Sequence, residues 1–539
     1  MHKVDARSAL TVEEKRNLYA QRVTEIKRKL AEYSNDSVLD IALTGLATAP
    51  QGTAIELLQS LPDLVFLLIK WKMLCPPTGV RKINGQQFHA LKSDLFALQS
   101  FAAELDNSSP PFLALRTFIM PQVKWQRDGS DEIFALVRQR IWFTKDANSD
   151  YYEDIFRNRT GLSIRSYYEI AFVIMTCISS YTEEKTMLIK LCDLVTKLSP
   201  TISIEEVAAF VRLLSVTPSQ LPAVFEPYRN DLCEAREYFQ QSAFNLKPLI
   251  LRDQSLQLVY KNLTRIALST IVPELLKSID GRTFKEKFGA TMERYTEDLL
   301  IRNNVSFIDE KEIAEIYATN KITETKITDF IIEDEGRIFV ESKAIEPNDF
   351  FTTCTEPAVL NRRLSESFVK AIFQAQACCD KVGKLDEFVS KPTYGLVILH
   401  QDFFFATGEK VERDVNPNLT EEIEKKYGDL PIPLKNIYYL PVHDLERLLA
   451  SLPASGKTLT QFLNRAIEND ERAETATMLF TMHIAEQLNG SIRNDERLMA
   501  ELELIQEEVG RLLLSNASYW NGKVEEYYHR YKRLIEYVG

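Results

Sequence analysis

The sequence contains few histidines and cysteines, and their spacing does not suit metal ligands. Its 539 residues include six His and seven Cys, and no CxxC, HExxH or HxH pattern links them. Zinc fingers and His-ligated zinc enzymes are therefore excluded, and a catalytic metal would have to be held by carboxylates. The odd cysteine count is typical of reduced thiols, so we expect a cytoplasmic protein.

The sequence also lacks a hydrophobic run long enough to cross a membrane. The longest apolar runs cover residues 64–74 and 170–180, and both fall short of the roughly 20 residues that a transmembrane helix needs. Lys70 and Lys72 interrupt the first run, and the first 17 residues contain no apolar stretch typical of a secretory signal. We expect two buried core helices and no membrane partner.

An excess of positive charge is missing as well. The net charge is −12, which argues against indiscriminate binding of polyanions. Residues 1–280 hold 33 Lys and Arg against 32 Asp and Glu, residues 281–415 hold 18 against 25, and residues 416–539 hold 14 against 20. A nucleic-acid surface is therefore expected mostly in the amino-terminal half, where residues 116–165 mix basic and aromatic residues, including Arg138 and Arg140.

The amino-terminal region, residues 1–280, is predicted to be helical, forming one or two all-α domains. Two capping boxes, Thr11 with Glu14 and Ser203 with Glu206, predict helix starts. Apolar residues recur at intervals of three and four in most of the other segments. The predicted helices cover residues 12–33, 53–74, 85–105, 163–181, 184–198, 207–214, 231–243 and 254–279.

The pattern changes near residue 281. An amphipathic helix over 284–299 precedes three short segments rich in β-branched and aromatic residues, then another helix and two more strands. This order predicts an α/β domain with one sheet over residues 281–415. The carboxy-terminal region, residues 416–539, is again predicted to be helical. The five predicted strands cover 305–308, 327–333, 337–343, 394–400 and 402–406, and the predicted helix between them covers 365–382.

The string Ser455-Gly456-Lys457-Thr458 is similar to the end of a phosphate-binding P-loop. The first glycine of that motif is replaced by Ser451, and no apolar strand precedes it. We interpret the string as the start of a helix and exclude ATP binding there.

Residues 326–344, KITDFIIEDEGRIFVESKA, carry the most specific chemical signal. Two apolar runs flank Asp334-Glu335-Gly336, which predicts a hairpin with a three-residue loop and a left-handed glycine. This loop pairs Glu333 with Arg337 and places Asp329 opposite Glu341, with Lys343 on the same face. Two carboxylates so close together repel each other unless a cation lies between them, and Mg²⁺ or Mn²⁺ suits oxygen ligands.

The hairpin resembles the PD-(D/E)xK phosphodiesterases, whose fold is restriction-endonuclease-like. Asp329 and Glu341-Ser342-Lys343 match the motif of that superfamily, with Thr328 where the name-giving pattern has proline. The resemblance covers about 125 residues. It implies a restriction-endonuclease-like α/β core, a mixed sheet flanked by helices. With the helical regions predicted on either side, we expect a predominantly α, multidomain protein. In that core Asp329, Glu341 and Lys343 would be catalytic, with Asp329 and Glu341 as metal ligands.

The same resemblance suggests further site residues. Glu293, on the helix before the meander, would be a third metal ligand. Gln374 or Gln376, on the helix after the motif, would contact the substrate. Apart from the resemblance, Arg362 and Arg363 follow the motif closely and are expected to touch a substrate phosphate near the site.

The predicted function is Mg²⁺- or Mn²⁺-dependent hydrolysis of nucleic-acid phosphodiesters, with DNA favoured over RNA. By analogy of architecture, a large helical region fused to such a core indicates a prokaryotic restriction or anti-phage defence effector. A partner protein or a homo-oligomer remains possible. The alternative is a catalytically silent nuclease fold that serves as a protein-interaction scaffold.

Overall fold

The computed structural model describes the chain except residues 1–10, 49–60, 99–109, 127–128, 181–187, 324–325, 346–350, 352–353 and 386–390. The chain divides into two compact units. The helical unit contains residues 1–108, 117–280 and 501–539, and the sheet unit contains residues 109–116 and 281–500. The protein is thus predominantly α-helical and multidomain, with one small mixed sheet in each unit.

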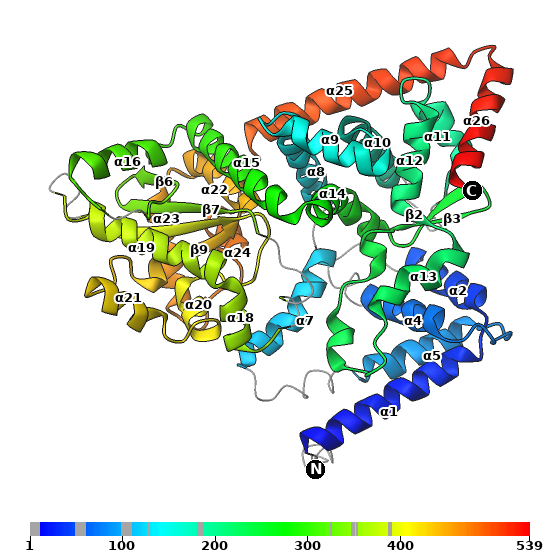
Figure 1. The fold of residues 1–539 in the computed structure, drawn as a ribbon, viewed down its shortest axis with the longest axis horizontal. Helices are drawn as coiled ribbons and strands as arrows, with labels where there is room; N and C mark the ends of the chain where they lie inside the picture. Colours follow the sequence, from blue (N-terminus) through cyan, green and yellow to red (C-terminus); the bar gives the residue numbers. More distant parts are fainter. Residues whose placement is uncertain are drawn as a thin grey trace. The chain divides into compact units, whose positions relative to one another are not determined.

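The helical unit is built mainly from amphipathic and buried helices (Figure 1). The Thr11–Glu14 capping box opens α1, and Ser203 accepts the Glu206 backbone N–H at the start of α12. Parts of the predicted helices 53–74, 85–105 and 184–198 lie outside the described residues. The helices are α1 (Val12–Ala31), α2 (Asn35–Ala47), α4 (Pro62–Leu74), α5 (Gly85–Phe96), α7 (Pro111–Gln126), α8 (Gly129–Thr144), α9 (Ser149–Thr160), α10 (Ile164–Ser180), α11 (Leu191–Leu198), α12 (Ile204–Leu214), α13 (Leu221–Phe225), α14 (Lys261–Ile279), α25 (Glu496–Tyr519) and α26 (Val524–Val538).

The prediction that residues 1–280 are all-α is wrong. A four-stranded sheet, in the order β1-β4-β3-β2, lies in this region. Its strands are only two to four residues long, too short to leave a clear alternating pattern in the sequence. The helix predicted over 231–243 is also wrong: the segment contains the 3-10 turn Ala235–Phe239, and a second one, Ala243–Asn245, begins at its last residue. Asp253 and Gln254 both have positive φ and form the two-residue turn of the hairpin. The strands are β1 (Leu188–Lys190), β2 (Ser215–Val216), β3 (Leu249–Arg252) and β4 (Ser255–Leu258).

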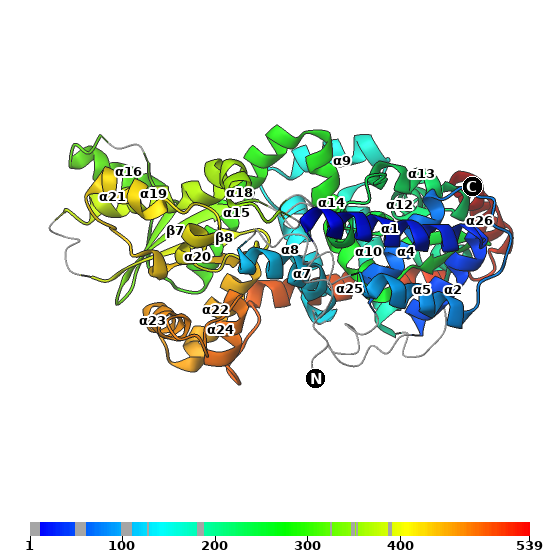
Figure 2. The same cartoon turned by 90° about the horizontal axis from the view of Figure 1, so that it is seen from below.

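The sheet unit contains a five-stranded mixed sheet in the order β5-β6-β7-β8-β9. β5, β6 and β7 form an antiparallel meander, while β8 and β9 continue the sheet in parallel to β7. Figure 2 shows α19 and α21 on one side of this sheet and α22, α23 and α24 on the other. The strands are β5 (Phe307–Asp309), β6 (Phe330–Glu333), β7 (Arg337–Lys343), β8 (Thr393–Leu399) and β9 (Ile437–Pro441).

Helices precede, interrupt and follow the meander. The helix predicted over 284–299 is present as α15, and the helix predicted over 365–382 is present as α19 after a π-helical turn at Ser365–Val369. The sequence missed α16, which lies between β5 and β6. The helices are α15 (Gly281–Arg302), α16 (Glu310–Thr319), α18 (Pro357–Leu364), α19 (Lys370–Val382), α20 (Gly408–Asp414), α21 (Leu419–Tyr427), α22 (Val442–Ser455), α23 (Leu459–Asp470) and α24 (Phe480–Gln487).

The order helix, three strands, helix, two strands is present, but the last strand is not the predicted one. Residues 402–406 form no strand, and β9 lies beyond the predicted boundary at 415. The expected carboxy-terminal region 416–539 is consequently divided. Residues 416–500 belong to the sheet unit because β9 pairs with β8, and residues 501–539 belong to the helical unit, where α26 packs on α11 and α12. A fragment ending at 415 would expose the edge of β8.

The string at residues 455–458 is a helix junction, as predicted. Gly456 ends α22 with a φ of 68°, the left-handed conformation that favours glycine. Thr458 then forms a capping box with Gln461 at the start of α23.

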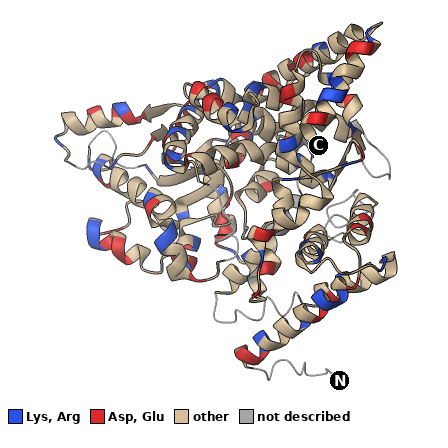
Figure 3. Cartoon of the chain, turned by 45° about the vertical axis from the view of Figure 1, so that its right-hand side comes forward, with Lys and Arg blue, Asp and Glu red and all other residues tan. Residues whose placement is uncertain are grey.

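The basic and aromatic stretch 116–165 forms only part of the exposed surface that the sequence suggested, because Lys145, Arg157, Arg159 and Arg165 are exposed but other basic residues are not. Arg116, Arg138 and Arg140 are all buried. Arg140 pairs with Glu501 at 2.9 Å and Glu508 at 2.5 Å, because its place on α8 faces α25. The side chains of Lys124 and Trp125, and all of Arg127, lie outside the described residues. Figure 3 shows acidic and basic residues interspersed along the helices.

Arg116 belongs to the sheet unit and anchors the start of α7 there. Its guanidinium donates to the carbonyls of Phe403 and Phe351, at 2.8 and 2.6 Å, and lies 4.6 Å from the centre of the Phe405 ring. Burial lowers the pKa of Arg116 to about 10, so the residue remains a cation at neutral pH.

No single described helix is long and apolar enough to cross a membrane. The consecutive helices α9 and α10 satisfy the length and composition together, but they are bent by 74° at the break between them. Most of the α10 apolar residues are buried in the helical unit, as expected for the run 170–180.

Replacing Arg140 with alanine should destabilise the helical unit. The change leaves the buried Glu501 carboxylate with Lys145 as its only remaining ion-pair partner in the described chain, and breaking a buried pair costs roughly 3 kcal/mol. Urea unfolding followed by circular dichroism should show a lower midpoint. Arg157→Ala is the matched control, because its pair with Glu153 is exposed and worth at most about 1 kcal/mol. Equal midpoints for the two variants would contradict the prediction.

Candidate active site

The β6–β7 hairpin brings the motif residues together. Its register pairs Glu333 with Arg337 and Phe330 with Val340, as the sequence predicted. Asp329 immediately precedes β6, and one more step along this register places it opposite Glu341. The Ser342 backbone N–H donates to Asp329 Oδ2 at 2.6 Å, which fixes the carboxylate beside the second strand.

The loop has the predicted length, but the reason for its glycine differs. Gly336 does not have a positive φ. A Cβ atom at this position would lie 2.5 Å from Tyr394 Cε2 and 3.0 Å from the Pro392 carbonyl oxygen. Glycine is needed because β8 approaches the hairpin closely, and the loop is held further by the Gly336 N–H, which donates to Thr460 Oγ1 at 2.9 Å.

The two faces of the hairpin pack against different surroundings. On one face, the side chains of Ile331 and Phe339 lie in the hydrophobic core that includes buried residues of α19. This is the face of Asp329, Glu341 and Lys343. On the other face, the Ser342 hydroxyl lies 3.0 Å from the Thr296 hydroxyl of α15. These contacts fix the strand that carries Glu341 and Lys343.

Glu341 and Lys343 form a partly buried ion pair. Glu341 is 1% exposed, and Lys343 Nζ donates to its Oε1 atom. The other oxygen, Oε2, is buried and has no hydrogen-bond partner among the described residues. Burying half of a carboxylate without a partner is unfavourable, so this oxygen is suited to a ligand with positive charge.

The pKa values of both carboxylates are raised, for partly different reasons. Burial, and then the Glu341 charge, raise the pKa of Asp329 well above its usual value. Burial raises the pKa of Glu341 to about 7, although the Lys343 ammonium acts in the opposite direction. The two carboxylates therefore bear an electrostatic cost at neutral pH that a divalent cation would offset.

Glu293 and Glu310 complete the acidic surroundings. Glu293 lies on α15 and is exposed. Partial desolvation, and then the charge of Glu310, raise the pKa of its carboxyl group. Its charge acts on both Asp329 and Glu341, and the charge of Glu310 acts on Glu341. The sequence analysis missed Glu310, the first residue of α16. The Asp309–Glu312 capping box that opens this helix was the available signal.

The two glutamines of α19 have different surroundings. Gln376 is buried, and its amide makes two hydrogen bonds, of 2.6 and 2.8 Å, to the backbone of Ile432. This pair of bonds gives Gln376 a structural role and excludes it from substrate contact. Gln374 lies nearer the motif, because its Nε2 donates to the Ile327 carbonyl at 3.5 Å, while its buried Oε1 has no partner in the described chain.

Thr328 occupies the position of the family's proline. It is fully buried, and its hydroxyl donates to the Cys378 thiol of α19 at 3.6 Å. The residue thus attaches the start of β6 to α19. Arg362 and Arg363 lie exposed in the last turn of α18.

The residues fit a divalent cation only in part. Asp329 and Glu341 supply oxygen ligands of the type that Mg²⁺ prefers, and the unpartnered Oε2 atom is available. Within the described ranges, however, no group of three or more His, Cys, Asp or Glu is arranged to hold a metal ion. Glu293 or Glu310 would have to move toward the pair to complete a three-carboxylate site.

Comparisons of the chain with protein-family models, with curated proteins and with solved structures give no match.

Asp329→Asn should raise the melting temperature of the metal-free protein at pH 8. A raised folded-state pKa means that the folded chain binds more protons than the unfolded chain between the two pKa values. Stability is therefore lost as the pH rises from the unfolded-state pKa to the folded-state pKa. The pKa of Asp329 is well above its usual value, and the same loss for the neighbouring Glu341 ends at a pH of about 7. Asparagine removes one charge and still accepts the Ser342 N–H. Each 1 kcal/mol gained corresponds to about 2–4 °C for a unit of this size.

The measurement is thermal unfolding in EDTA at pH 8 and at pH 4, where the gain should largely disappear because wild-type Asp329 is then neutral. Glu335→Gln, which removes an exposed carboxylate from the loop of the same hairpin, should change the melting temperature little at either pH. A lower melting temperature for Asp329→Asn at pH 8 would show that the charge is not a source of strain.

Proposed function

We propose that this protein is a Mg²⁺- or Mn²⁺-dependent nuclease that hydrolyses phosphodiester bonds, with DNA as the favoured substrate, on a restriction-endonuclease-like core. The observation that carries the proposal is the arrangement at the end of the hairpin. The buried Glu341 carboxylate, the partly buried Asp329 carboxylate and Lys343 meet there, and Glu341 Oε2 has no partner within the described part of the chain. The strand order of the sheet unit, β5-β6-β7-β8-β9, also supports a restriction-endonuclease-like core.

In this proposal Asp329 and Glu341 hold the metal, and Glu293 is the candidate third ligand. A bound divalent cation polarises the phosphodiester and lowers the pKa of a coordinated water. Lys343 would release Glu341 and donate to the attacking water or to the negative charge that develops on the phosphate. Gln374, with its unpartnered Oε1 beside the motif, would orient water or substrate.

The rival function is a silent nuclease fold that acts as a protein-interaction scaffold. The observation that favours it is the ion pair of Lys343 with Glu341, which already neutralises one carboxylate without a metal. A role in restriction or anti-phage defence extends the nuclease proposal by analogy of architecture.

Asp329→Ala, Glu341→Ala and Lys343→Ala should each lower the rate of DNA cleavage by at least about a hundredfold, because each removes a group that acts on the reacting phosphate. The assay compares linear, circular and single-stranded substrates, DNA and RNA, in Mg²⁺ or Mn²⁺. Ca²⁺ should bind without supporting turnover. Glu335→Gln, at the loop of the hairpin, should cleave at the wild-type rate.

Wild-type activity in any two of the three variants, or cleavage that survives EDTA, would rule out this site. Calcium binding, followed by calorimetry, separates the two functions. A nuclease site loses Ca²⁺ affinity in Asp329→Ala, whereas a silent scaffold binds no metal in either protein.

Arg362→Glu together with Arg363→Glu should weaken DNA binding about tenfold or more and flatten its salt dependence, since fewer phosphates would be neutralised. The two arginines are exposed on α18 in a net acidic region. Lys425→Glu with Lys426→Glu makes the same charge change on the exposed end of α21 and should have a smaller effect. Fluorescence anisotropy at several salt concentrations, with Ca²⁺ in place of Mg²⁺, measures both. Equal losses would mean that only net charge matters.

A further inference from the structure

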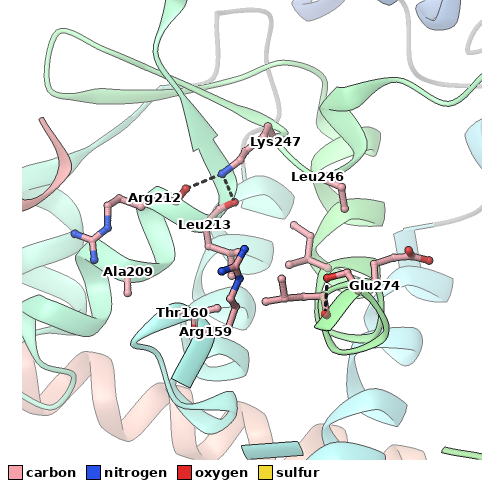
Figure 4. A pocket seen from close by; sticks show the side chains of 11 residues that line it. Arg159, Thr160, Ala209, Arg212, Leu213, Leu246, Lys247 and Glu274 are labelled. Atoms are coloured by element: carbon pink, nitrogen blue, oxygen red, sulfur yellow. Dashed lines mark hydrogen bonds between the residues drawn. The ribbon is translucent and has the colours of Figure 1, made fainter. Parts of the chain in front are cut away.

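The helical unit contains a cavity that the proposed nuclease chemistry does not use. Its volume is about 520 Å³, within the range of small-molecule sites. The lining comes from the end of α9, from α12, from α14 and from residues 246–247 just before β3 (Figure 4). All of these residues belong to one compact unit.

Most of the cavity wall is apolar. Leu246 is 43% exposed although it is a large hydrophobic residue, and Leu213 and Leu275 are only partly buried. Covering such a surface would be favourable for an apolar ligand. The apolar lining residues are Ala209, Leu213, Leu246, Ile271 and Leu275.

Two cations add a polar end to this cavity. Lys247 Nζ donates to the carbonyls of Arg212 and Leu213, both at 2.8 Å, and a third N–H is left for another acceptor. Desolvation lowers the Lys247 pKa, so a nearby anion would be favourable. Arg159 has neither an ion-pair nor a hydrogen-bond partner in the described chain, and Figure 4 shows its side chain extending into the space between the walls.

The remaining charged residues of the lining are differently placed. The Arg212 guanidinium donates to the Tyr537 carbonyl at 2.8 Å, and in Figure 4 it points away from the other lining side chains. Glu274 lies on the α14 wall, across the cavity from Arg159 in the same view, and is 3.7 Å from Lys277. The cationic end is thus made by Arg159 and Lys247.

We propose that this cavity binds a small amphipathic anion, with an apolar ring against the leucine wall and one phosphate or carboxylate group bound by Arg159 and Lys247. The apolar lining provides the area for a ring, and the guanidinium fork suits either kind of anionic oxygen. A single anionic group is favoured because Glu274 would repel a second one on the opposite wall.

The test uses full-length protein in EDTA, so that no metal site contributes, and 1-naphthyl phosphate as the probe in isothermal titration calorimetry. We expect saturable binding of one molecule per chain. Arg159→Ala should weaken it about tenfold, since a hydrogen bond to a charged group contributes that much. The matched control is Arg157→Ala, two residues earlier on the same helix and outside the lining, which should leave the dissociation constant within about twofold.

Two further arms define the ligand class. 1-Naphthoate tests a carboxylate in place of the phosphate, and neutral 1-naphthol should bind at least about tenfold more weakly than the better anion and should not respond to Arg159→Ala. Ala209→Phe, which fills the cavity, should abolish binding of the anions while thermal unfolding confirms that the variant folds. Absence of saturable binding by both anions, or equal losses in Arg157→Ala and Arg159→Ala, would overturn the proposal.

Discussion

The pairing of β6 with β7 is the constraint on which the candidate site depends. One antiparallel register, fixed between Glu333 and Arg337, determines which side chains face each other four residues further along. A shift by one residue would turn Glu341 and Lys343 to the face of α15 and would break the hydrogen bond between the Ser342 N–H and Asp329. The close packing of Gly336 against Tyr394 resists such a shift, because any larger residue or displaced strand would overlap the tyrosine ring.

The same pairing makes the site electrostatically unfavourable. Burial raises the pKa values of Asp329 and Glu341, and the Glu341 charge raises that of Asp329 further. Lys343 offsets only part of this cost. The surrounding core keeps the arrangement in place, since Ile331 and Phe339 pack in the cluster that includes α19 and Ser342 contacts Thr296. Stability supplied by apolar packing thus holds together polar groups that would separate on their own, as is common at functional sites.

Two arginines of α8 are used inside the helical unit. Arg140 links α8 to α25 through Glu501 and Glu508, and Arg138 is buried beside the Trp142 ring. Charge reversal at these positions would therefore disrupt packing before it informed on nucleic-acid binding. Arg159 differs, because it is exposed at an apolar cavity and has no partner in the described chain. A division of labour between the two units follows from this contrast, with cleavage proposed for one and small-anion binding for the other.

The sequence determined the features that depend on local spacing. Apolar periodicity located α15 and α19, the capping residues located the starts of α1 and α12, and the hairpin length placed Asp329 opposite Glu341. Side chains alternate every two residues along a strand and repeat every 3.6 residues along a helix. The residues close by in the sequence are therefore enough to define which side chains share a face.

Only the tertiary structure decided which distant segments meet. β9 completes the sheet from 38 positions beyond the end of β8 (Leu399 to Ile437), and the short strands β1 to β4 form only because they pair with one another. Long-range packing also separated residues that looked alike in the sequence. Gln376 binds the Ile432 backbone while Gln374 does not, and Arg140 is buried while Arg159 is exposed. The physical reason is that burial and partners are set by the segment that packs against a residue, which its own neighbours in the chain do not specify.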